Sequence, residues 1–292
     1  MHPVHSPALF PRWYSVGAAL VAVMLWSSAP LLAEFAKATP PLQLTAVTLL
    51  AGSLATLPLS RRINVAACGA GWQLSVWMGI PLLIFGAVST YFIGMRLAPA
   101  AEAALITYTW PVLFVLLSQW SRFGRLRIAG VVGALIAFSG ASLLLVPQTI
   151  SGGLGGATTG YALALLAACC WAIYSWLSQA APVALTSLLP RLLLMACAIA
   201  VAASLILEGT LALPSGEALL AGIALGLGPY GVAMVAWDKA LRWGHASLVG
   251  SLAYGVPILA ALLLVLANMS VLDWRLPAAT VLVVVGCLKA GR

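Results

Sequence analysis

The stretch YFIGMRLAPAAEAALITYTWP, residues 91–111, places several polar and aromatic side chains in an otherwise apolar chain. It aligns without a gap with WDKALRWGHASLVGSLAYGVP, residues 237–257, at an offset of 146 residues, half of the 292-residue chain. Three residue types match in register: Arg96 with Arg242, Tyr108 with Tyr254, and Pro111 with Pro257. The alignment predicts that the two halves of the chain are copies of one repeated unit.

The composition indicates a membrane protein. Hydrophobic residues make up 63% of the chain, charged residues only 7%, and the mean hydropathy is +1.09, whereas about one quarter of a typical soluble domain is charged. About 20 mainly apolar residues are needed to cross a bilayer as a helix. We therefore expect an all-α polytopic protein with ten transmembrane helices, at residues 15–36, 41–60, 72–95, 101–120, 128–147, 160–180, 185–207, 217–237, 246–267 and 274–290.

The ten predicted spans divide into two groups of five. A Gly-rich segment, SGGLGGATTG at residues 151–160, breaks the long uncharged run in the middle of the chain and is typical of a flexible linker. From the N-terminus, the sequence predicts a cytoplasmic tail at 1–14, a first repeat at 15–147, a linker at 148–159 and a second repeat at 160–292. Because a long apolar span follows Arg12, we expect a retained helix at the N-terminus and no cleavable signal peptide.

The distribution of basic residues predicts the orientation of the chain. If both termini are cytoplasmic, 11 of the 14 Lys and Arg residues lie on the cytoplasmic side, and only Lys37, Arg96 and Arg275 face outward. This asymmetry agrees with the positive-inside rule for an even number of helices. The net charge of +8 is therefore explained by membrane orientation, and nucleic acid is not an expected partner.

An odd number of helices in each repeat has a topological consequence. Five spans force the second copy to cross the membrane upside down relative to the first, so Arg96 and Arg242 are predicted to lie on opposite faces. Trp26 and Trp171 are 145 residues apart, in the first span of each half, and support the same alignment. Inverted repeats are a recurring architecture of secondary transporters, although a duplication retained only for packing has the same signature.

With these features the sequence resembles a known family. The two inverted five-helix repeats, the segment ALITYTWPVLFVLLS at 104–118 and the segment GALIAFSGASLLLV at 133–146 are similar to the EamA type of the drug/metabolite transporter superfamily, and most like the YddG-type aromatic amino-acid exporters. The resemblance implies an inner-membrane secondary exporter that alternates between outward-open and inward-open states. It also implies a central cavity lined by the first, third, fourth, sixth, eighth and ninth spans. The repeat is imperfect at two positions, where Leu248 replaces Glu102 and Val256 replaces Trp110.

Aromatic residues and small hydroxyl residues within the spans are the candidates for substrate binding. Trp and Tyr offer a broad apolar face and one polar group, which suits an aromatic or cationic solute. The predicted substrate-binding residues are Trp26, Ser27, Tyr91, Thr107, Tyr108, Trp110, Trp171, Tyr174, Tyr230 and Tyr254. Aromatic residues also form interfacial belts, which we expect for Trp13, Tyr14, Trp72, Trp243 and Trp274, and Ser or Thr hydroxyls often bond to their own helix.

Ionisable residues are scarce within the predicted spans. No acidic residue lies near the middle of a span, and Asp238 is expected just beyond the end of the eighth span, so tight proton coupling is not indicated. Arg191 lies a turn or two inside the seventh span. It is expected to snorkel to the cytoplasmic surface, with capture of a substrate carboxylate at an inner gate as the alternative.

Other function classes find little support. The chain has three His residues and no metal-binding or catalytic motif, so we expect neither an enzyme nor a metal or other cofactor. Phosphorylated cargo would favour buried Lys or Arg residues within the spans. The preferred interpretation is an exporter of aromatic or large apolar amino acids, and the alternative is an exporter of small organic or drug cations. The expected partners are a small-molecule substrate and the lipid bilayer, and the sequence is compatible with a monomer or a homo-oligomer.

Overall fold

The computed structural model describes residues 12–98, 100–145, 157–209, 214–266 and 274–290. These residues form helices joined by short connections and contain no β-strand, so the predicted all-α class is confirmed. Most of the predicted N-terminal tail and most of the predicted linker at 148–159 lie outside the described residues.

Each half of the chain contains long helices, some of them interrupted. In the first half the elements are α1 (Arg12–Ser27), α2 (Ala29–Phe35), α3 (Pro41–Thr56), η1 (Leu57–Leu59), η2 (Val65–Ala67), α4 (Ala70–Leu74), η3 (Ser75–Gly79), α5 (Ile80–Leu97), α6 (Ala100–Thr107), α7 (Trp110–Phe123) and α8 (Ile128–Leu145). In the second half they are α9 (Thr158–Ala180), η5 (Leu185–Ser187), α10 (Leu189–Leu207), α11 (Gly216–Leu227), η6 (Gly228–Val232), α12 (Ala233–Trp243), α13 (Ala246–Leu252), α14 (Gly255–Leu266) and α15 (Arg275–Ala290).

The described helices include eight stretches that are long and apolar enough to cross a membrane. Two of the ten predicted spans fall short of that criterion. The apolar segment Ile128–Leu143 of α8 is shorter, and α15 has 16 residues with Arg275 at its start and Lys289 in its last turn.

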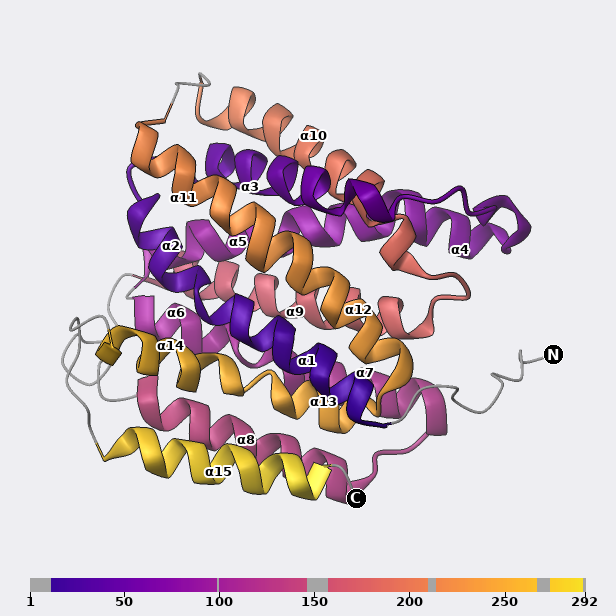
Figure 1. Cartoon of the computed structure of the whole chain (residues 1–292), viewed down its shortest axis with the longest axis vertical. Helices are drawn as coiled ribbons and strands as arrows, with labels where there is room; N and C mark the ends of the chain where they lie inside the picture. Colours follow the sequence, from indigo (N-terminus) through magenta and orange to yellow (C-terminus); the bar gives the residue numbers. More distant parts are fainter. Residues whose placement is uncertain (1–11, 99, 146–156, 210–213, 267–273, 291–292) are drawn as a thin grey trace.

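The long helices lie side by side in one bundle. Figure 1 shows α8 and α15 together at one edge and α3 and α10 near the opposite edge. The most extensive packing joins helices from different halves of the chain: α8 with α15, α5 with α9, α3 with α10 and α11, and α1 with α12. The core of the bundle is therefore built between the two halves.

Small residues set the distance between the packed helices. A Cβ atom added at Gly286 of α15 would lie 2.6 Å from the backbone nitrogen of Ala137 and 2.6 Å from the carbonyl oxygen of Gly133 in α8. At Gly226 of α11 it would lie 2.4 Å from the Thr48 carbonyl oxygen in α3. Close backbone approach at small residues is the usual basis of helix association in lipid.

Three spans predicted as continuous helices are interrupted. The predicted helices at 15–36, 101–120 and 246–267 break between α1 and α2, between α6 and α7, and between α13 and α14. Pro30, Pro111 and Pro257 lie within the first three residues of the following helices. Proline has no backbone N–H and fits the first turn of a helix far better than its interior, which explains a new start at each position.

The eighth predicted span also differs from its expected form. It contains the π-helical turn η6 around Pro229 and continues as α12 to Trp243, instead of ending at residue 237. Asp238, expected outside the span, therefore lies inside a helix and is only 1% exposed. The expectation that Asp238 lies just beyond the end of this span is therefore wrong, although the residue is still near the end of the helix and not at its middle.

The close packing of α8 against α15 predicts that one methyl group added at this contact lowers the stability of the protein. Gly286→Ala is expected to lower the free energy of unfolding by about 1–3 kcal/mol, because the added atom meets backbone atoms that cannot rotate away. Gly17→Ala is the matched control, since no atom lies within 4 Å of a Cβ at that position. Reversible unfolding in mixed micelles measures both, and equal stability of the two variants would contradict the packing assignment.

Candidate functional site

A cavity lies where the interrupted helices meet, and its empty space, open solvent included, is about 600 Å³. Eleven residues line it: Trp26, Ala29, Pro30, Tyr91, Thr107, Tyr108, Trp110, Trp171, Tyr230, Ala253 and Val256. Eight of them lie at or within two residues of the three helix breaks, and the π-helical turn supplies Tyr230. Irregular backbone at membrane depth is tolerated where it is buried in protein or lines a cavity, and this is where the described breaks lie.

Indole rings form the main surface of the cavity. The ring centroid of Trp26 lies 6.2 Å from that of Trp171 and 6.1 Å from that of Trp110. The ring of Trp171 stacks on Tyr230 with centroids 6.2 Å apart and an angle of 21° between the planes. Because Trp26, Trp110, Trp171 and Tyr230 come from four different helices, these contacts join both halves of the chain around one space.

Trp26 is held by a hydrogen bond across the bundle. Its Nε1 donates to the carbonyl oxygen of Pro229 at 2.8 Å, in the π-helical turn of the other half. This bond fixes the ring orientation and satisfies a partly buried N–H group, which would otherwise cost free energy. Trp26 thus connects the break after α1 to the interruption between α11 and α12.

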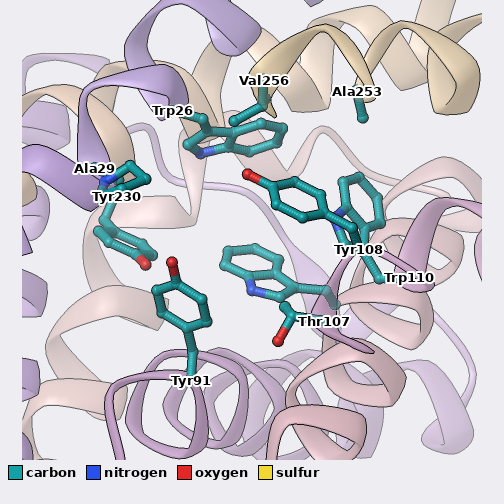
Figure 2. A pocket seen from close by; sticks show the side chains of 11 residues that line it. Trp26, Ala29, Tyr91, Thr107, Tyr108, Trp110, Tyr230, Ala253 and Val256 are labelled. Atoms are coloured by element: carbon teal, nitrogen blue, oxygen red, sulfur yellow. The ribbon is translucent and has the colours of Figure 1, made fainter. Parts of the chain in front are cut away.

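Three tyrosines provide the polar part of the lining. Figure 2 shows the hydroxyl groups of Tyr91, Tyr108 and Tyr230 directed into the space enclosed by the rings. Thr107 also faces the cavity, but its hydroxyl bonds to the Ala103 carbonyl oxygen of its own helix at 2.9 Å. No lining residue carries a formal charge at neutral pH, so the cavity offers ring faces and phenolic hydroxyls.

Seven of the ten predicted substrate-binding residues line the cavity, and three do not. Ser27 is buried, and its hydroxyl donates to the Met24 carbonyl oxygen at 2.6 Å. Tyr174 lies behind Trp171, with ring centroids 5.7 Å apart, and is fully buried. Tyr254 packs on Phe138 of α8, with ring centroids 5.9 Å apart, away from the lining.

The remaining residues of interest lie outside the cavity. Arg191 is exposed near the start of α10 and lines no part of the cavity. Trp13 and Trp274, expected in an interfacial belt, are 72% and 67% exposed at helix starts. These exposures separate them clearly from the half-buried and buried tryptophans of the cavity.

The small lining residues and one further tryptophan were not among the predicted site residues. Ala29, Ala253 and Val256 line the cavity because they flank the helix breaks, and the prolines of the spans are the only sequence signal for such positions. Trp237 is fully buried beside the lining, with its centroid 5.1 Å from Trp26 and 5.4 Å from Trp110. Its alignment with Tyr91 in the other repeat was the signal that it belongs to this region.

A polar network beside Trp237 ties α12 to α9 and to the turn before α10. Trp237 Nε1 donates to Ser175 Oγ at 3.1 Å. The carboxylate of Asp238 accepts from Ser178 Oγ at 2.6 Å, from the backbone nitrogen of Thr186 at 3.0 Å, and from the Thr186 hydroxyl. These bonds compensate the burial of the acid, as a buried carboxylate requires.

Comparisons with known proteins agree with this architecture. The EamA-like transporter family matches the chain twice, over residues 13–146 and 158–290. The chain belongs to this family. Together with the apolar helices, this makes it a multi-pass protein of the inner membrane, and membership indicates a transporter and not an enzyme.

The similarity to known proteins covers nearly the whole chain. The protein named aromatic amino acid exporter YddG from Ancylobacter novellus is 34% identical over 274 residues, which cover 92% of this chain and 94% of the relative. A solved crystal structure superposes with a TM-score of 0.79 at 34% sequence identity, covering 94% of this chain and 98% of the other. The overall arrangement of helices is therefore shared with a protein of known structure.

The network around Asp238 predicts a clear stability effect. Asp238→Ala is expected to lower the free energy of unfolding by about 3 kcal/mol, because it leaves the donors of Ser178 and Thr186 buried without an acceptor. Lys239→Ala, at the adjacent and less buried position, is expected to cost less than about 1 kcal/mol. The two variants are compared by unfolding of the purified protein in detergent, and equal losses would contradict this role of Asp238.

Proposed function

We propose that the protein is a secondary exporter that carries aromatic or large apolar amino acids across the inner membrane. The observation that carries this proposal is the uncharged cavity of indole and phenol rings. The similarity to a relative named as an aromatic amino acid exporter supports it over nearly the full chain. The residues proposed to bind substrate are Trp26, Tyr91, Thr107, Tyr108, Trp110, Trp171 and Tyr230.

The lining suits this cargo on physical grounds. Offset-stacked or edge-to-face contacts between aromatic rings add about 0.5–1.5 kcal/mol per pair beyond the burial of apolar area. The hydroxyls of Tyr91, Tyr108 and Tyr230 point into the same space and can accept from an ammonium group or donate to a carboxylate. A zwitterionic amino acid has no net charge and so needs no charged partner, whereas a phosphorylated cargo favours Lys or Arg in the lining.

A small organic cation is the second candidate substrate. Faces of Trp and Tyr attract a cation within about 6 Å of the ring centroid, and four such residues surround the cavity from different helices. Both cargoes use the same rings, so a competition experiment separates them.

The proposed architecture is ten membrane spans arranged as two inverted five-helix repeats. The two family matches, at 13–146 and 158–290, coincide closely with the predicted repeats at 15–147 and 160–292. The packing is also consistent with a two-fold relation. In this relation α1 corresponds to α9, α3 to α10, α5 to α12 and α8 to α15. The contact of α5 with α9 then has its counterpart in the contact of α12 with α1. The contacts of α3 with α10 and of α8 with α15 each join a helix to its own counterpart.

Two arginines make equivalent bonds in the two halves. Arg96, at the end of α5, donates to the Thr39 carbonyl oxygen before α3. Arg242, at the matching position of α12, donates to the Val183 carbonyl oxygen before α10 at 3.0 Å. This is the pattern expected of an inverted repeat whose matched residues anchor matched loops on opposite faces.

Alternating access around the cavity is the proposed mechanism, with both termini in the cytoplasm. The helix breaks lie at the cavity and divide each interrupted span into two short rigid segments. Hinges are often placed at such element ends, where a few residues absorb the change in backbone angles. Rocking of the segments around Trp26 and Trp171 exposes the cavity alternately to the two sides.

Transport by the purified protein in liposomes tests the proposed function. Counterflow of labelled phenylalanine is expected to be saturable and to be competed by tryptophan, with and without an imposed pH gradient. Flux of a quaternary ammonium compound without any competition by phenylalanine would replace the amino-acid assignment with the cation assignment. Strict dependence on the pH gradient would contradict facilitated transport and direct attention to Asp238.

Single substitutions test the cavity. Trp26→Ala and Trp171→Ala are each expected to lower the initial rate of counterflow at low substrate concentration by about tenfold, because a stacking surface is lost. Trp274→Ala is the control, since this tryptophan is exposed and far from the lining. Folded yield is measured by size-exclusion chromatography. Unchanged flux in both cavity variants would contradict the site.

A further inference from the structure

A second pocket lies between the ends of α7 and α9 and the start of α13. It has about 350 Å³ of empty space, open solvent included. The polar residues of its lining are Ser118, Gln119, Arg122, Arg127, Gln179, His245 and Ser247. None of its lining residues lines the aromatic cavity. Figure 1 places α7 and α13 near the end of the bundle where α15 also finishes.

The pocket gathers positive charge that no acid compensates. The guanidinium carbons of Arg122 and Arg127 lie 5.6 Å and 5.8 Å from the centroid of the same Phe123 ring. Gly124, with a φ of 62°, ends α7 in the left-handed conformation, so the chain turns back and brings both arginines to this ring. No carboxylate lines the pocket, and the ion pair found among the described residues, Lys37 with Glu34, involves neither arginine.

Buried polar side chains hold the pocket in shape. Gln119 is buried; its Oε1 accepts from the backbone nitrogen of Arg127 at 2.6 Å, and its Nε2 donates to Ser247 Oγ at 3.0 Å. Ser118, also buried, donates to the Gln179 side chain. A Cβ at Gly130 would lie 2.3 Å from Gln119 Nε2, so this glycine leaves the room that the amide occupies. The position of Arg127 is therefore fixed by α7 and indirectly by α13.

Apolar side chains around the pocket indicate the kind of ligand. Trp120 and Ile128, on either side of the turn that carries the arginines, are 65% and 79% exposed, and Leu126 between them is also exposed. In a membrane protein such side chains face lipid, and Trp prefers the level of the headgroups. A ligand with an anionic head and apolar chains matches both parts of this surface, whereas a soluble anion matches only the basic part.

We propose that this basic pocket binds the phosphate group of an anionic phospholipid, with the acyl chains lying along Trp120 and Ile128. Arg122 and Arg127 supply charge-assisted hydrogen bonds to the phosphate oxygens, a geometry that guanidinium groups favour. A phosphate bound between Arg122 and Arg127 offsets the repulsion between the two positive charges, which lie against the same Phe123 ring. The proposal concerns a lipid site and is independent of which substrate the aromatic cavity carries.

Titration of the purified full-length protein with short-chain lipids tests this site. Dioctanoyl phosphatidylglycerol is expected to bind measurably in a neutral detergent by native mass spectrometry, and dioctanoyl phosphatidylcholine much more weakly. R122Q/R127Q is expected to weaken phosphatidylglycerol binding by roughly 30-fold, and each single variant by roughly fivefold. The single variants provide the test if the double variant is not recovered folded.

R61Q/R62Q is the matched control because it also removes two exposed arginines, neither of which lines the pocket. It is expected to bind phosphatidylglycerol within twofold of the unmodified protein. Equal weakening by both double variants, or no weakening by R122Q/R127Q, would overturn the site. Inorganic phosphate that displaces the lipid at equal concentration would show a soluble-anion site. Phenylalanine that displaces it would show a substrate site, and either result would overturn the lipid assignment.

Discussion

The structure depends on one constraint of the bilayer: a backbone polar group in hydrocarbon must be satisfied within the protein. Uninterrupted helices meet this constraint along α9 and α10, which form much of the buried packing. The breaks before α2, α7 and α14 and the π-helical turn η6 interrupt the regular helical hydrogen bonding, and residues beside all four line the same cavity. They are compatible with lipid surroundings because they converge on one cavity, where protein side chains replace lipid.

The same breaks determine the chemistry of the cavity. Prolines restart the helices, so residues beside them point into the shared space instead of along a continuous helical face. Ser28 and Thr109 satisfy carbonyl groups next to two of the breaks, at 2.7 Å each, which leaves the lining to aromatic rings and phenol groups. An uncharged aromatic surface follows, made of ring faces and a few hydroxyls. Charged side chains lie elsewhere, for example Arg96 and Arg242, which bond to carbonyl oxygens in loops.

The sequence predicted most of the fold and a large part of the cavity. Hydropathy located the helices, and rare aromatic residues within apolar spans indicated Trp26, Trp110 and Trp171, all of which line the cavity. Tyr254 was predicted as an aromatic residue within an apolar span, but the break before α14 turns it toward α8. The hydropathy pattern carries no information on such a rotation. Asp238 was misplaced because a search for uncharged runs ends a span at the first charge. The hydrogen bonds that allow its burial come from α9 and from Thr186, far away in sequence.

The central claim is that the aromatic cavity holds the amino-acid substrate. It is tested most directly by crystallising the protein with 4-iodophenylalanine and locating the iodine by its anomalous scattering. The account predicts an iodine peak among the rings of Trp26, Trp171 and Tyr108, with the amino-acid group near the hydroxyls of Tyr91 and Tyr230. An iodine peak only in the pocket of Arg122 and Arg127, or only at a lipid-facing surface, would contradict it.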